Sequence, residues 1–196
     1  MTHSRSQSKI KKTYLAIDRF SELSGRAVSW LVLAMTLLIA YDVIMRYFFQ
    51  SGSVALQELE WHLFALIFLF GAAYTLKHHD HVCVDILMQR QFMTAKVHAW
   101  IYFLCTLFFL LPFCVLVIYS SWDYVANSYN ILPSGERSPD PGGLPYRYLL
   151  KAAIPTAFAL LFLQGVSLAL RSYAVICGEE VALPCYEHEF KHGEDS

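Results

Sequence analysis

The chain has 196 residues, the length of one ordinary domain, but 56% of them are hydrophobic and only 16% are charged. Soluble domains carry about 25% charged residues, so this composition argues against a soluble fold. The net charge of −1 indicates no particular class of partner, and no basic patch typical of nucleic-acid binding is present.

The apolar residues are gathered in four long blocks from which Asp, Glu, Lys and Arg are absent: 27–41, 61–76, 97–122 and 152–170. A helix needs about 20 residues to cross a ~30 Å hydrocarbon core, and each block reaches that length with its flanking residues. The blocks are too long and continuous for strands of an outer-membrane barrel. We therefore predict an all-α integral membrane protein, with a membrane domain at 25–172 and spanning helices at 26–49, 56–76, 97–120 and 146–171.

The segment before the first spanning helix is polar and patterned. Residues 1–9 are rich in Ser, Lys and Arg, and we expect them to be disordered. In residues 10–24 the apolar side chains recur on one helical face, which predicts an amphipathic helix on the membrane surface, ended at Ser24-Gly25. A simple extension of the first spanning helix remains the alternative.

Lys and Arg are concentrated before the first block, between the second and third, and after the fourth. By the positive-inside rule this distribution places both termini in the cytoplasm. The turn at 50–53 and the longer segment at 121–145 then lie outside. Residues 173–196 are acidic and without apolar periodicity, so we expect a disordered cytoplasmic tail.

Three ionisable residues lie near the outer end of the first two helices. Asp42 and Arg46 are four residues apart on one helical face, and Glu58 opens the second helix across a short turn. The spacing predicts a network of all three. It is either a structural contact between helices or, because ionisable residues at membrane depth are often functional, a proton or ion relay.

The stretch KHHDHVCVD at 77–85 contains residue types that bind zinc, but its spacing matches no standard zinc pattern. We interpret it as a helix end that enters the cytoplasm, and we expect no metal site. The other histidines do not pair at matching depth for a haem, and no catalytic constellation is present, so neither a cofactor nor an enzyme is expected. Trp61 belongs to an interfacial aromatic belt, and Gly71 fits a close helix contact.

The ordered motifs resemble the small membrane subunit of tripartite ATP-independent periplasmic (TRAP) transporters over residues 20–172. The matching motifs are RYFF at 46–49, QEL at 57–59, FGAAY at 70–74, HVCVD from His81 to Asp85, and GLP from Gly143 to Pro145. Cys83 within the fourth motif departs from the family pattern.

This resemblance implies a bacterial inner-membrane protein with two protein partners. A soluble periplasmic receptor would capture an organic acid, and a large membrane subunit would move it inward using a sodium gradient. The small subunit would brace the large one and help dock the receptor. The resemblance also places Arg46 and Glu58 in the network described above, and His81 and Asp85 in a motif of the inner loop. The alternatives are a haem-bearing anchor of a respiratory complex and a self-assembling channel.

Overall fold

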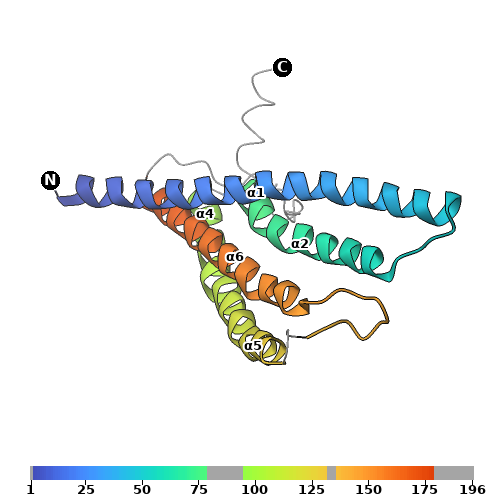
Figure 1. Cartoon of the computed structure of the whole chain (residues 1–196). Coiled ribbons are helices and arrows are strands. Elements are labelled where there is room, and N and C mark those ends of the chain that lie inside the picture. The colour runs from blue at the N-terminus through green and yellow to red at the C-terminus, as the bar shows by residue number, and fades with distance from the viewer. Residues whose placement is uncertain (1, 79–94, 132–135, 179–196) are drawn as a thin grey trace, which may run out of the picture.

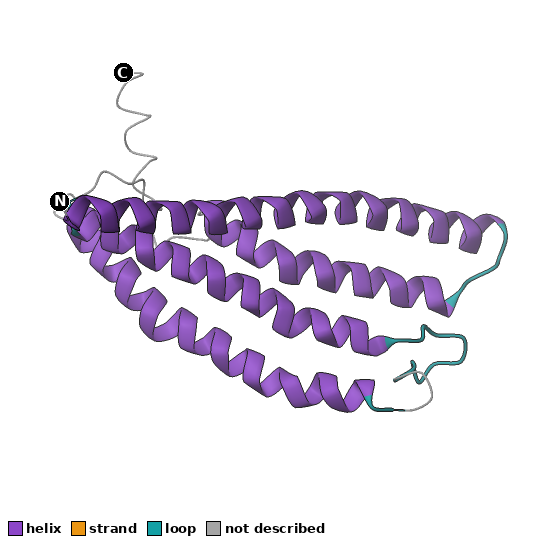
Figure 2. Ribbon diagram, turned by 60° about the vertical axis from the view of Figure 1, so that its left-hand side comes forward, coloured by secondary structure: helices purple, strands orange, loops and turns teal. Residues whose placement is uncertain are grey.

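The structure, a computed structural model, describes residues 2–78, 95–131 and 136–178. Within these ranges the regular structure is entirely helical, and four long rods lie side by side (Figure 1, Figure 2). The elements are α1 (Thr2–Phe48), α2 (Val54–His78), α4 (Ala95–Cys105), the π-helical turn η1 (Thr106–Leu110), α5 (Leu111–Tyr129) and α6 (Arg147–Ile176). The elements α4, η1 and α5 follow one another directly and form the third rod.

All four rods contain a segment long and apolar enough to cross a membrane, with mean hydropathies of 2.1, 1.5, 2.7 and 1.9 in chain order. Large apolar side chains are exposed along the bundle, for example Trp30, Phe68 and Phe109. In water this exposure would be costly, whereas hydrocarbon accepts it. The predicted all-α fold with four spanning helices is confirmed.

The helix α6 is the centre of the bundle. It packs against α1, α2, α4, η1 and α5, while α1 also packs along α2. Its buried residues are mostly small or polar: Ala153, Ala157, Gln164, Gly165, Ser167, Leu168, Ala169, Ser172, Ala174 and Val175. Small side chains let helix backbones approach closely where lipid provides no hydrophobic driving force between helices.

The first rod differs from the prediction. The helix α1 is continuous through Ser24-Gly25, so the separate helix at 10–24 and the disorder at 2–9 are both wrong. The hydroxyl of Ser24 donates to the Ser21 carbonyl within the helix, and Ser29 donates to the Gly25 carbonyl. Gly25 is buried against Tyr74 of α2, where any side chain would overlap the ring. The glycine therefore serves a close helix contact and does not end the helix.

The third rod is longer than predicted, because it runs on to Tyr129 where the sequence suggested a loop from Ser121. Its π-helical turn comes directly before Pro112, and the Leu111 N–H donates to the Thr106 carbonyl five residues back. A proline lacks an N–H and its ring clashes with the carbonyl four residues earlier. The wider turn gives this ring room, so the helix continues past the proline.

The remaining boundaries fall within five residues of the predicted ones, as α2 covers 54–78 and α6 covers 147–176. The turn after α1 closes through Gln50, which has a φ of 50°, and through the Ser51 N–H, which donates to the Met45 carbonyl. We call the end of the bundle with residues 49–53 and 136–146 the hairpin end. The opposite end, where α2 and α6 stop and α4 begins, is the terminal end.

Candidate functional site

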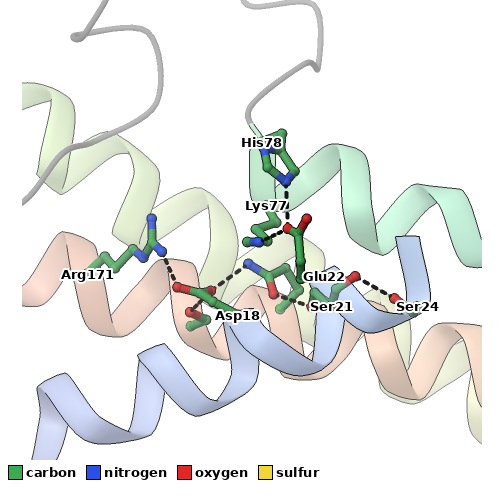
Figure 3. A network of polar contacts seen from close by, with 9 residues as sticks. Asp18, Ser21, Glu22, Ser24, Lys77, His78 and Arg171 are labelled. Carbon is green, nitrogen blue, oxygen red and sulfur yellow. Dashed lines mark hydrogen bonds and ion pairs between the residues drawn. The ribbon is translucent and has the colours of Figure 1, made fainter. Parts of the chain in front are cut away.

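A set of largely buried polar side chains joins α1 to α6 at the terminal end (Figure 3). This terminal cluster consists of Asp18, Ser21, Gln164, Ser167 and Arg171. One oxygen of Asp18 accepts from Gln164 Nε2 at 3.2 Å and from Ser167 Oγ at 3.0 Å, while Arg171 donates to its second oxygen. Ser21 Oγ donates to Gln164 Oε1 at 2.6 Å. Both carboxylate oxygens are therefore satisfied by residues more than 140 positions away in the sequence.

The terminal cluster is buried and its charges are balanced. Asp18 is 6% exposed and Ser167 is fully buried, and the Arg171 guanidinium also lies 5.3 Å from the centre of the Tyr14 ring. Removing one partner of a buried ion pair leaves an uncompensated charge, which costs about 3–5 kcal/mol. The cluster thus fixes α1 against α6 in one position.

A second contact at the same end joins α1 to α2. Lys77 and His78, in the last turn of α2, both reach Glu22 of α1 (Figure 3). One turn further along α1, Gly25 lies directly under the ring of Tyr74. Cations suit the negative end of a helix, and Lys77 lies in the last turn of α2.

The importance of Asp18 was missed from the sequence, which placed it on the polar face of a surface helix. The structure shows that Tyr14, Asp18, Ser21 and Gly25 form one buried stripe at spacings of three and four. On α6, Gln164, Ser167 and Arg171 repeat the same spacing. Two polar stripes of matching period on different helices were the available signal.

At the hairpin end, Glu58 of α2 binds the connection that leads into α6. Its carboxylate accepts from the Ser138 hydroxyl and, at 2.7 Å, from the Leu144 backbone N–H. Gly143 approaches so closely that a Cβ there would meet both Ser138 and the Glu58 carboxylate. A buried carboxylate therefore holds the segment at 138–144 against the start of α2.

A second acid, Glu136, holds the other part of this loop. It accepts from Lys151 of α6 and, at 2.7 Å, from the Ser128 hydroxyl of α5, and its backbone carbonyl accepts from the Arg147 N–H. Hydrogen bonding to the Lys151 ammonium, then to Ser128, holds the pKa of the Glu136 carboxyl below its usual value. We call the contacts of Glu58 and Glu136 together the loop cluster.

The network predicted for Asp42, Arg46 and Glu58 is only partly present. Arg46 Nη2 lies 2.6 Å from Asp42 Oδ2, so the predicted ion pair forms. Glu58 does not join it in the described part of the chain, because Ser138 and Leu144 occupy its two oxygens. The acceptor positions predicted for Arg46 are taken instead by donors from a loop at least 80 residues away, which no sequence pattern near Glu58 indicates.

The other predicted residues are placed as follows. Trp61 and Pro145 are exposed, as a side chain in an interfacial belt and a loop residue would be. A Cβ at Gly71 would meet no atom within 4 Å, so the close helix contact expected there is absent between the described residues of this chain. His81 and Asp85 lie outside the described residues. Within the described ranges no three metal-binding side chains gather.

These contacts brace helices and position a loop. Four apolar helices of this length define a multi-pass helical membrane protein. Residues 35–174, more than half of the chain, match the family described as tripartite ATP-independent periplasmic transporters, DctQ component. The chain belongs to this family, which confirms the resemblance and makes it a bacterial inner-membrane transporter component.

Two curated relatives agree with the family. The chain is 35% identical over 92 residues to the C4-dicarboxylate TRAP transporter small permease protein DctQ of Vibrio cholerae, covering 46% of this chain and 38% of the relative. It is 29% identical over 113 residues to a Haemophilus influenzae protein provisionally named a TRAP transporter small permease protein, covering 57% of this chain and 66% of the relative. The matches thus span less than two thirds of each relative. They favour a transporter subunit over the haem-bearing anchor.

Proposed function

We propose that this chain is the small membrane subunit of a sodium-driven, receptor-dependent transporter that takes up organic acids. It braces a large membrane subunit and helps to dock a periplasmic receptor. The substrate class follows the name of the Vibrio cholerae relative, which points to C4-dicarboxylates. The family match over residues 35–174 is the observation that carries the proposal.

The internal contacts support a bracing role. The acids of the terminal cluster and the loop cluster bind partners in this chain and do not line a continuous polar path. A transport route needs a hydrated or polar site between moving elements, usually near the bilayer midplane. We therefore assign substrate movement and sodium coupling to the large partner subunit, with no cofactor on this chain.

The proposed orientation has both termini in the cytoplasm, following the excess of Lys and Arg at the terminal end. The hairpin end then faces the periplasm, and the loop held by Glu58 and Glu136 lies where a soluble receptor approaches. Arg137 and Asp140 are exposed on this loop and offer charged contacts. The exposed apolar faces of α1 and α5 remain for lipid and the large subunit.

The test is uptake of a radiolabelled C4-dicarboxylate into proteoliposomes that contain this chain, the large subunit and the receptor. We expect uptake only with all three proteins and an inward sodium gradient, and none when potassium replaces sodium. Full uptake without this chain would refute the bracing role. Uptake by this chain alone would make it the transporter.

A further inference from the structure

The two ends of the bundle are packed very differently. The rods meet at the terminal end and fan apart toward the hairpin end (Figure 1, Figure 2). On α1 four residues are buried within 14–25, whereas from there to the end of the helix only Asp42 is buried. On α6 eight of the ten buried residues lie within 164–175. Close packing therefore joins the helices at the terminal end.

The hairpin formed by α1 and α2 has few buried residues with which to hold the other helices at its outer end. The buried residues of α2 are Ala73, near the terminal end, and Glu58, near the hairpin end. Asp42 of α1 forms its ion pair with Arg46 of the same helix. Of the residues of this hairpin that are buried at the hairpin end, Glu58 is thus the one that binds another part of the described chain.

The four rods therefore form two pairs that are joined at two places. The helix α1 packs along α2, and α5 packs along α6. At the terminal end, Asp18 binds Gln164, Ser167 and Arg171 and so joins the first pair to the second. At the hairpin end the two pairs are joined where Glu58 binds the loop at 138–144.

The loop itself belongs to the second pair. It runs directly into α6, and Glu136 at its start binds Ser128 of α5 and Lys151 of α6. When the two pairs move relative to one another, the loop moves with α5 and α6. The contact between Glu58 and the loop is then the one that must break.

We propose that Glu58 and the loop at 138–144 form a strap that closes the hairpin end and can be released. On release, α1 and α2 swing together away from α5 and α6, and the terminal cluster is the pivot. This conformational device belongs to the chain alone and does not depend on the proposed transporter role.

The strap is easier to break than the pivot. Glu58 accepts hydrogen bonds from a hydroxyl and a backbone N–H, and no cation in the described ranges forms an ion pair with it. Both donors lie in a loop at the end of the bundle, where water can replace the lost partners. Asp18, in contrast, has a charged partner and is 6% exposed, so its separation leaves largely buried charges unpaired.

The closed strap also requires a close fit. A Cβ at Gly143 would overlap the Ser138 side chain and meet the Glu58 carboxylate. The backbone of the loop therefore lies directly against the carboxylate that holds it. A substitution at Gly143 offers a way to open the strap without removing the charge of Glu58.

The test is double electron–electron resonance of the full chain in lipid bilayers, with the five native cysteines replaced by alanine. One pair of spin labels is attached at the hairpin end, to cysteines placed at the exposed Ser51, between α1 and α2, and Asp123 of α5. A second pair is attached at the terminal end, at the exposed Arg19 of α1 and Lys96 of α4. The first pair measures opening of the strap, and the second pair measures movement at the pivot.

In the parent chain we expect one dominant distance for each pair of labels. Glu58→Ala removes both hydrogen bonds of the strap, so the ratio of a longer to the shorter distance at the hairpin end should rise about tenfold or more. Gly143→Ala should lengthen the same distance, because its Cβ overlaps Ser138. The terminal pair should keep its distance in both variants. The control Asp140→Ala, an exposed residue of the same loop, should change neither distance.

Unchanged distances at the hairpin end in both Glu58→Ala and Gly143→Ala would overturn the proposal. Equal lengthening at both ends would also overturn it, because the bundle would then loosen as a whole without a pivot. A longer distance that already dominates in the parent chain would show that the strap does not close this end. If Glu58→Ala fails to fold, judged by its helical circular dichroism, Gly143→Ala decides the question.

Discussion

The terminal cluster and the loop cluster both use a carboxylate to join distant parts of the chain, but they join different things. Asp18 connects two spanning helices through side chains that are almost wholly buried. Glu58 and Glu136 connect helices to a partly exposed loop, in part through backbone groups. The first arrangement determines how the helices pack, whereas the second determines where a loop lies. We therefore expect mutations in the first to affect stability and in the second to affect local order.

The largest effect is expected for Asp18→Ala, which leaves the largely buried Arg171 side chain without its counter-charge. We expect the free energy of unfolding to fall by about 3–5 kcal/mol. Thermal unfolding in mild detergent, followed by circular dichroism, measures it. The neighbouring exposed Arg19→Ala is the control and should change little. Equal midpoints for the two variants would show that the terminal cluster does not stabilise the bundle.

The contact between α1 and α2 is tested by Gly25→Leu, whose side chain would overlap the Tyr74 ring. Overpacking of this kind costs about 1–3 kcal/mol. The matched control is Gly71→Leu, a helical glycine with no neighbour within 4 Å of its Cβ position. Adding Tyr74→Ala to Gly25→Leu should restore part of the lost stability. If the double variant is no more stable than Gly25→Leu alone, the contact between Gly25 and Tyr74 is not the cause.

The loop cluster is tested by Glu58→Ala, which removes both acceptors of the segment at 138–144. Hydrogen bonds to charged groups contribute about 1.5–3 kcal/mol, so the Leu144 amide should exchange with heavy water at least tenfold faster. The exposed Asp140→Ala in the same loop is the control. The thermal unfolding midpoint of the helices should fall less in Glu58→Ala than in Asp18→Ala. Unchanged exchange at Leu144 would mean that Glu58 does not hold the loop.

The smallest effect concerns pH. The pKa of Glu136 is lowered from its ordinary value of 4.5, chiefly by Lys151, so its contacts contribute stability above that value. This contribution is lost as the pH falls through the lowered pKa. Acidification should therefore loosen the loop, seen as loss of protection at the Arg147 amide. Glu136→Gln should abolish this pH dependence, and a dependence that persists in it would assign the effect to another group.

The elements of the fold were largely predictable because spanning length and apolar composition dominate in lipid. The positions of Asp18 and Glu58 were harder to predict for a physical reason. A short polar residue on a helical face looks the same whether the face meets headgroups or another helix, so Asp18 was assigned to a surface. Likewise, a carboxylate at the start of a helix suggests an ion pair with the nearest cation in the sequence. Glu58 instead binds a loop that only the folded bundle brings close.

The unbroken α1 makes the two ends of the molecule mechanically dependent on each other. Asp18 and Phe48 are separated by thirty residues of one helix, or about 45 Å. A rigid rod of that length, turned by about 5° at Asp18, moves its far end by about 4 Å. The hydrogen bonds of Asp18 to α6 therefore determine where the hairpin end of α1 lies relative to the rest of the bundle.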